Sequence, residues 1–302
     1  MQSHSAEAEW DFYFCKMVDF DERLYKLLDA ALLEDVGDGD HSTLACIAPG
    51  AKGKAILKIK QEGILAGLDI AEKIFRYKQP FCIFKRYKND GEAMKFGEVA
   101  FELETNIHAI LQCERLVLNC MQRMSGIATL TKTYTDKLEG YKTRLLDTRK
   151  TTPNFRLLEK EAVRIGGGVN HRFGLFDMIM LKDNHIDYTG GLEQAVNKAY
   201  DYVQEYRPDL KIEVETRSIE DVKTLVEIGK GKVFRIMVDN FTSQQVAEAL
   251  KIIEGNFETE ASGGINLENI QEYAATGVDY VSVGGLIHQA TSLDLSLKAI
   301  IA

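Results

Sequence analysis

From about residue 140 onward, short apolar segments alternate with longer segments in which apolar residues recur at helical spacing. Each apolar segment has the length of a buried strand, and each segment between them is long enough for a helix. This alternation predicts parallel strands joined by right-handed crossovers. The predicted strands cover residues 143–147, 177–182, 211–215, 233–239, 257–261 and 279–283, and the predicted helices cover residues 155–165, 191–206, 218–229, 243–254 and 266–276.

The pattern before residue 140 is different, because strands with alternating polar and apolar residues are mixed with two short helices. A longer amphipathic helix is predicted near residues 107–124, and it joins the two parts. The expected fold class is therefore α/β, with a mixed α/β N-terminal sandwich domain and a parallel α/β barrel. We expect the sandwich domain over residues 1–125, the barrel over residues 126–290, and a C-terminal helix over residues 291–302 that packs back on the first domain.

Polar residues follow the C-terminal end of every predicted strand in the second part. Active sites of α/β barrels collect at this rim, whereas a doubly wound sheet concentrates them at one switch point. The distribution favours a barrel, and because six strands are evident we expect it to be incomplete. The polar residues at these strand ends are Arg149 and Lys150, Lys182, Glu213, Asp239, Ser262 and Gly263, and Gly284 and Gly285.

Composition narrows the choice of partner and compartment. The net charge of −9 argues against nucleic acid or an anionic membrane as the main partner. Five cysteines without a CxxC pair argue against a zinc knuckle or a disulfide framework. The N-terminal segment lacks the basic start and apolar core of a secretory signal, and no apolar run approaches the length of a membrane span. These features predict a cytoplasmic protein.

Residues 145–186 hold a cluster of cations that contrasts with the acidic chain as a whole. Arg149, Lys150, Arg172 and Lys182 would place four positive charges around one cavity, and Arg115 and His171 could raise the number to six. A neutral sugar or a monocarboxylate would leave much of this charge uncompensated, which is costly in a buried site. A dicarboxylate beside a phosphorylated sugar would balance it.

Glycine motifs in the same part of the chain do not match a known nucleotide-binding loop. Gly166–Gly168 fails the dinucleotide pattern because His171 occupies the last glycine position, and a P-loop motif is absent from the sequence. We interpret the triple glycine as the end of a helix and a bend that directs His171 and Arg172 inward. Glycine pairs at 263–264 and 284–285 are either ordinary strand-to-helix turns or loops that bind phosphate.

Several segments occur in the order found in one enzyme family. The sequence resembles the quinolinate phosphoribosyltransferases, also called carboxylating nicotinate-nucleotide pyrophosphorylases, from about residue 20 to the C-terminus. Several motifs in the right order are more specific than any one of them. The matching segments are DTRKTTP, GGGVNHRFGLFD and LKDNHI within residues 145–186, ERLVLN (114–119), IEVET (212–216), MVDNF (237–241), ASGGI (261–265) and VSVGG (281–285).

The resemblance implies a reaction and a division of roles. Quinolinate would react with 5-phosphoribosyl 1-diphosphate, with Mg²⁺ as cofactor, to give nicotinate mononucleotide, diphosphate and CO₂ in NAD biosynthesis. It assigns Thr148, Arg149, His171, Arg172, Lys182 and, from the partner subunit of a homodimer or an assembly of dimers, Arg115 to quinolinate. It assigns Lys150 to the diphosphate, Glu213 and Asp239 to ribose and metal, and Ser262, Gly263, Gly264, Gly284 and Gly285 to the 5-phosphate. Lys150, Lys182, Glu213 and Asp239 would be the catalytic residues.

Other interpretations of these residues stay open. Glu213 and Asp239 could form ordinary salt bridges, and Arg115 could be a surface residue. Glu215 is a rival of Glu213 as metal ligand, because both lie on one side of a strand. A related group associated with molybdenum transport shares the fold. A non-catalytic anion-binding barrel would bind ligand without releasing diphosphate, and an aldolase-like barrel would use Lys182 as a Schiff-base amine.

Overall fold

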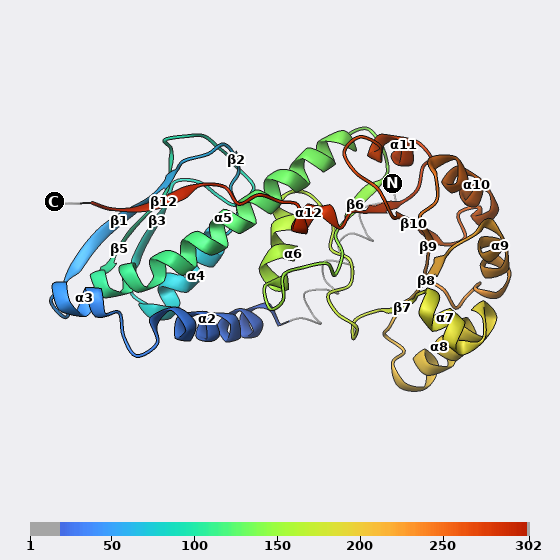
Figure 1. Cartoon of the computed structure of the whole chain (residues 1–302), viewed down its shortest axis with the longest axis horizontal. Coiled ribbons are helices and arrows are strands. Elements are labelled where there is room, and N and C mark those ends of the chain that lie inside the picture. The colour runs from blue at the N-terminus through green and yellow to red at the C-terminus, as the bar shows by residue number, and fades with distance from the viewer. Residues whose placement is uncertain (1–18, 301–302) are drawn as a thin grey trace. The chain divides into compact units, whose positions relative to one another are not determined.

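The computed structural model describes residues 19–300 (Figure 1). The chain forms two compact units. The first unit contains the residues up to Lys132, Thr151–Gly167 and the residues from Leu286, and the second contains Thr133–Lys150 and Gly168–Gly285. This division differs from the predicted boundary at residues 125 and 126, and it assigns residues 151–167, predicted as part of the barrel, to the first unit.

The first unit is built on a four-stranded antiparallel sheet in the order β12-β1-β5-β3, beside a two-stranded pair of β2 and β4. Its strands are β1 (Lys52–Ile59), β2 (Gly63–Ile64), β3 (Ile83–Arg86), β4 (Ala93–Met94), β5 (Val99–Asn106) and β12 (Leu295–Ile300). Its helices are α2 (Phe20–Val36), α3 (His41–Cys46), α4 (Leu68–Lys78), α6 (Arg156–Ile165) and most of α5 (Ile107–Lys137), which continues into the second unit.

One face of this sheet forms the core of the first unit. Alternate residues of β1 are buried, including Leu57 and Ile59, as expected for a strand with one covered face. The ring of Phe75 on α4 lies 6.2 Å from that of Phe101 on β5, and Phe101 stacks on Phe84 of β3 at 4.5 Å. These aromatic contacts fix α4 on the sheet.

The prediction for the C-terminal residues was partly wrong. Residues Leu295–Ile300 form strand β12 instead of a helix, and β12 pairs antiparallel with β1. The burial pattern agrees with a strand, since Leu295 and Leu297 are buried with a polar residue between them. The last residues of the predicted helix, 301–302, lie outside the described residues.

The second unit is a six-stranded parallel sheet in the order β6-β11-β10-β9-β8-β7. Successive strands are neighbours from β7 to β11, and β11 returns to β6, which is the order of a barrel left open between β6 and β7. The incomplete barrel is therefore confirmed. Its strands are β6 (Arg144–Leu146), β7 (Ile179–Leu181), β8 (Ile212–Thr216), β9 (Arg235–Asp239), β10 (Glu258–Ser262) and β11 (Tyr280–Ser282).

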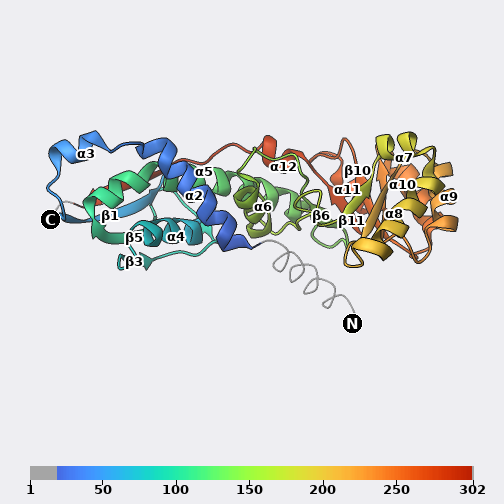
Figure 2. The ribbon, with the colours of Figure 1, turned by 90° about the horizontal axis from the view of Figure 1, so that it is seen from below.

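Helices cover the outer face of this sheet, and α8, α9 and α10 lie side by side along it (Figure 2). Each shows the apolar stripe that predicts such packing, for example Val222 and Leu225, both fully buried on α9. The helices are α7 (Asp183–Thr189), α8 (Leu192–Tyr206), α9 (Ile219–Ile228), α10 (Ser243–Ile253) and α11 (Ile270–Ala274), followed by α12 (Gly285–His288) at the boundary with the first unit.

The cysteines and the helices of residues 19–300 bear on the expectations about disulfides and membrane spans. Cys82, Cys113 and Cys120 are buried free thiols and Cys46 is an exposed one, so no disulfide joins the cysteines of residues 19–300. Burial raises the pKa of the Cys120 thiol to about 12. No helix within residues 19–300 is long and apolar enough to cross a membrane.

Candidate active site

A cavity of about 510 Å³ opens at the C-terminal ends of the strands of the second unit. Every strand from β6 to β11 contributes to its wall, either through its last residues or through the loop that follows. The parallel register explains this, since it brings all six carboxyl ends to one rim. The lining residues are Thr148, Arg149, Lys150, His171, Arg172, Met180, Lys182, Glu215, Met237, Asp239, Asn240, Glu260, Ser262, Gly263, Gly264, Ile265, Ser282 and Gly284.

Cations gather on the side of the cavity formed by β6, β7 and the loop between them. The Arg172 guanidinium is buried and donates to the carbonyl of Met178 at 3.2 Å. Burial lowers the pKa of Arg172, and the positive charge of Arg149 lowers it further. Two guanidinium groups that repel each other across a cavity wall form a site for a dianion.

Lys182 lies where the cationic and acidic sides meet. Its Nζ lies 2.7 Å from Oε2 of Glu215, and about half of the lysine side chain remains exposed to solvent. Glu215 therefore balances the charge of Lys182.

The acidic side is formed by Glu215 on β8 and Asp239 at the end of β9. Burial raises the pKa of Asp239, and the neighbouring Glu215 adds to the rise, against opposing contributions from the Ser262 hydroxyl, Lys182 and Lys150. A pair of carboxylates that repel each other in a polar cavity is stabilised by a hard cation with oxygen ligands. Mg²⁺ fits these residues, since it binds through one or two carboxylates and the phosphates of a substrate.

The loop after β10 forms the third side. Gly263 and Gly264 have positive φ values of 94° and 66°, a conformation that favours glycine. A Cβ at Gly263 would lie 2.2 Å from Oδ1 of Asn240, so the loop also needs glycine for space. Gly284 lines the cavity after β11, whereas Gly285 does not and instead begins the short helix α12.

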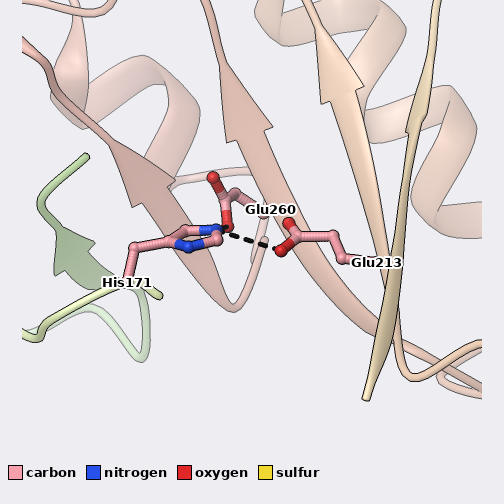
Figure 3. Close-up of side chains that lie close together, drawn as sticks. All are labelled: His171, Glu213 and Glu260. Atoms are coloured by element: carbon pink, nitrogen blue, oxygen red, sulfur yellow. Dashed lines mark ion pairs between the residues drawn. The ribbon is translucent and has the colours of Figure 1, made fainter. Parts of the chain in front are cut away.

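A layer of buried charge forms the floor of the cavity and continues beneath it. Glu213 is fully buried and does not line the cavity. Its Oε2 lies 3.0 Å from Nε2 of His171, and that nitrogen lies 3.3 Å from Oε2 of Glu260 (Figure 3). Because Glu213 is two residues before Glu215 on β8, the same face of the strand presents them at different depths. Glu213 therefore does not line the cavity, whereas its rival Glu215 does; the assignment of either residue to ribose and metal stays a prediction.

Arg235 completes the buried layer from the neighbouring strand β9. Its Nη1 lies 3.1 Å from Glu260 and 3.9 Å from Glu213, and its Nη2 lies 3.0 Å from Glu258. The carboxylates raise the pKa of Arg235 against the cost of burial. The guanidinium therefore stays charged and neutralises part of the acidic layer.

His171 receives opposite influences at its two ring nitrogens. Burial alone would lower its pKa, but Glu213 and Glu260 outweigh burial and raise it to about 9. The amide N–H of Arg172, in contrast, donates to Nδ1 at 2.7 Å, which requires a lone pair there. The backbone N–H of His171 donates to the buried Asp147 at 2.7 Å. Since the amide contact is part of the backbone geometry, we assign the ring as an Nε2–H tautomer.

Most of the predicted site residues therefore meet in one cavity. Of the residues assigned from sequence, Glu213 and Gly285 do not line it, and Arg115 is exposed on α5 in the first unit. Sequence reasoning missed Asn240, Glu260 and Ser282. The alternation of strand residues could have identified two of them, because Glu260 and Ser282 precede Ser262 and Gly284 by two positions and so share their face.

Comparison with known proteins agrees with this geometry. The C-terminal domain description of the quinolinate phosphoribosyl transferase family matches residues 127–298, and the N-terminal domain description matches residues 40–125. A quinolinate phosphoribosyltransferase [decarboxylating] 1b from Nicotiana tabacum is 42% identical over 289 residues, covering 90% of this chain and 81% of the relative.

Bacterial proteins are similar in sequence and in structure. A probable nicotinate-nucleotide pyrophosphorylase [carboxylating] from Bacillus subtilis is 42% identical, covering 91% of this chain and 93% of the relative. The crystal structure of NadC from Streptococcus pyogenes superimposes with a TM-score of 0.84 at 38% identity, covering 92% of this chain and 98% of that chain. The chain belongs to the quinolinate phosphoribosyltransferase family.

Proposed function

We propose that the cavity of the second unit binds quinolinate at its cationic side and 5-phosphoribosyl 1-diphosphate at its acidic and glycine-rich sides. The protein is a decarboxylating quinolinate phosphoribosyltransferase, a pentosyltransferase of NAD biosynthesis. The observation that carries the assignment of the substrates to the two sides is the separation of charge around one cavity. Arg149 and Arg172 come from the segment between β6 and β7, whereas Glu215 and Asp239 come from the C-terminal ends of β8 and β9.

The arrangement of cations and acids around the cavity suits a reaction between a dicarboxylate and a phosphorylated sugar. The pyridine nitrogen attacks C1 of the ribose as diphosphate leaves, and loss of the 2-carboxylate as CO₂ then gives nicotinate mononucleotide. Little proton transfer is needed at the sugar, so we expect catalysis mainly from positioning and charge stabilisation. Arg149 and Arg172 hold the two carboxylates of quinolinate, with Thr148 as a further contact. This fixes the ring nitrogen toward the ribose.

The remaining residues act on the sugar and its phosphates. Lys150 neutralises the leaving diphosphate, and Lys182 stabilises negative charge near the carboxylate that is lost. Glu215 and Asp239 orient the ribose hydroxyls and would hold Mg²⁺, directly or through water. When bound, Mg²⁺ supplies neutralisation of the diphosphate charge. The Ser262 hydroxyl and the backbone N–H groups of the loop after β10 donate hydrogen bonds to the 5-phosphate.

Turnover is tested by incubating the protein with quinolinate, the diphosphate sugar and Mg²⁺. We expect CO₂, diphosphate and nicotinate mononucleotide in equal amounts, and no reaction with the pyridine monocarboxylate nicotinate, which cannot engage both arginines. Ligand binding without release of diphosphate would instead support a non-catalytic anion-binding barrel. Turnover of another anion in place of quinolinate would support a relative of the molybdenum-transport-associated group.

We also propose a homodimer, or an assembly of dimers, in which Arg115 reaches the cavity of the partner subunit. Arg115 is exposed on α5, so its guanidinium is available to another chain. Mixing an Arg115→Ala chain with a Lys182→Ala chain should restore part of the activity, because one site in each heterodimer is then intact. No recovery in heterodimers of confirmed composition would rule out sharing.

For the compartment we propose the cytoplasm, on the basis of the free cysteines and the composition. Several plant relatives are named as mitochondrial or chloroplastic proteins. Fractionation of the cells that make this protein would decide between these compartments, and recovery with an organelle would overturn the proposal.

A further inference from the structure

Three side chains from distant parts of the chain converge at the floor of the cavity, where His171 and Glu260 contribute to the lining and Glu213 is buried beneath it. His171 comes from the loop before β7, Glu213 from β8 and Glu260 from β10 (Figure 3). Glu213 and Glu260 are fully buried and His171 is 5% exposed. Burial of two carboxylates is expensive unless cations pair with them. The reaction described above uses neither carboxylate, so their cost points to another role.

The contacts of His171 indicate what that role is. Its Nε2 lies between two carboxylate oxygens, at 3.0 Å and 3.3 Å, where a lone pair would be repelled and a hydrogen is attracted. Its Nδ1 accepts the amide N–H of Arg172 at 2.7 Å. The ring is therefore held at both nitrogens, by the acid pair on one side and by the backbone of Arg172 on the other.

Arg172 connects this arrangement to the substrate. Its side chain lines the cavity, and the carbonyl of Met178 fixes the guanidinium at 3.2 Å. We propose that Glu213 and Glu260, braced by Arg235, are positioning residues that lock the His171 ring and thereby hold Arg172 for the dicarboxylate. This proposal rests on the proposed substrates and adds a second layer of residues to their site.

The same three side chains could be read as a metal site, because their ligand atoms lie within 4.8 Å of one another. Arg235 argues against a cation there. Its Nη1 lies 3.1 Å from Oε2 of Glu260, the oxygen that also faces His171. A divalent ion between these groups would bring two positive charges toward a buried guanidinium. The acid pair is instead balanced by Arg235, while Nε2 of the neutral His171 ring faces both acids.

The test compares variants that differ only in whether the acid faces His171. Glu213→Gln and Glu260→Gln remove a carboxylate from the ring, whereas Glu258→Gln removes the third partner of Arg235 without touching His171. We expect the KM for quinolinate to rise about tenfold in the first two variants, because small displacements of a binding group are costly. The KM for the diphosphate sugar should change less than about twofold, and Glu258→Gln should behave like the wild type.

A double-mutant cycle separates this role from a loss of stability. If the acids act through the ring, Glu213→Gln should have little further effect on the KM for quinolinate in a His171→Gln background. Additive effects, or equal changes in both KM values, would overturn the proposal. Wild-type turnover of quinolinate in the same assay checks the proposed function independently of these variants.

A measurement on the unmodified protein covers the case in which the variants fail to fold. In ¹⁵N-labelled protein, the His171 ring should show a protonated Nε2 and a non-protonated Nδ1 at neutral pH, with Nε2–H protected from exchange with solvent. The other five histidines of the chain, assigned by single substitutions, serve as references. An Nδ1–H tautomer, or rapid exchange of the Nε2 proton, would contradict the proposed lock.

Discussion

Glu213 and Glu215 lie two residues apart on the same face of β8, yet they have different environments. Glu213 is fully buried among His171, Glu260 and Arg235, whereas Glu215 lines the cavity and pairs with the half-exposed Lys182. Strand β8 thus supplies Glu213 to a buried layer of charge and Glu215 to the wall of the cavity.

The two layers differ in how their charge is balanced. The buried layer, formed by His171, Glu213, Glu260 and Arg235, is neutralised by contacts within the second unit. In the open layer at the rim, Lys182 pairs with Glu215, and Arg149, Arg172 and Asp239 also line the cavity. We propose that depth separates residues that maintain the site from residues that bind substrate. The following predictions test that separation.

The largest effect is expected from breaking the buried layer. Arg235→Ala would leave Glu213 and Glu260 without their guanidinium, and we expect the free energy of unfolding to fall by about 3–5 kcal/mol. Urea denaturation followed by circular dichroism measures this loss. Arg207→Ala, which removes a surface pair with Asp209, should cost less than about 1 kcal/mol. Losses of equal size in the two variants would mean that the buried charges contribute no more to stability than a surface ion pair.

A rim substitution should reverse this pattern, with a large loss of activity and a small loss of stability. Lys182→Ala is expected to lower kcat/KM by roughly 10²–10³-fold, because a charge aimed at the reacting groups is removed. The free energy of unfolding should change by less than about 1 kcal/mol, since the lysine is half exposed. Lys223→Ala, which removes a surface pair on α9, is the matched control and should stay fully active.

The acid at the rim should govern the metal requirement. In Glu215→Gln, the Mg²⁺ concentration for half-maximal activity is expected to rise about tenfold, since one carboxylate near the metal is lost. Titration of activity with MgCl₂ measures this. Glu220→Gln, an exposed acid on α9, should leave the titration unchanged. An unchanged titration in Glu215→Gln would remove this residue from the metal site.

The smallest effect concerns the pH dependence of stability. Glu213 and Glu260 favour a folded-state pKa of His171 of about 9, whereas the Arg172 amide donates to Nδ1 and opposes a second ring proton. A ring that this amide keeps neutral does not change its charge between pH 6.5 and 9, so it adds no pH dependence to the free energy of unfolding in this range. We therefore expect urea denaturation across this range to give equal slopes in the wild type and in His171→Gln. A loss of stability toward pH 9 that is present only in the wild type would show that the folded ring carries two protons and would contradict the assigned tautomer.

Much of the second unit could be predicted from sequence, because buried parallel strands appear as short apolar segments that alternate with helical ones. All six strands follow from short segments that alternate with helical ones and end in polar residues or glycine, and two of them, at Leu146 and Leu181, stop abruptly at charge. The choice between Glu213 and Glu215 could not be made in this way. Both positions satisfy the same alternation, and only the register with Arg235 on β9 and the approach of His171 determine which one is sealed.

The first unit was harder to predict at its C-terminus. Residues 295–300 contain the apolar and polar alternation of a strand within a segment that also suits a helix. What decides between the two is the open edge of β1, and a partner so distant in sequence leaves no local signal. In residues 295–300, pairing with β1 therefore outweighs the local preference for a helix.

The position of β12 has a consequence for how the protein is made. The sheet of the first unit lacks its outer strand until the ribosome has also synthesised every strand of the second. Meanwhile β1 presents an unpaired edge on the nascent chain. Lysines at positions 52, 54 and 58 recur along this strand, and charged side chains of that kind discourage pairing with other molecules. We expect them to protect the growing polypeptide from aggregation until translation delivers the final strand.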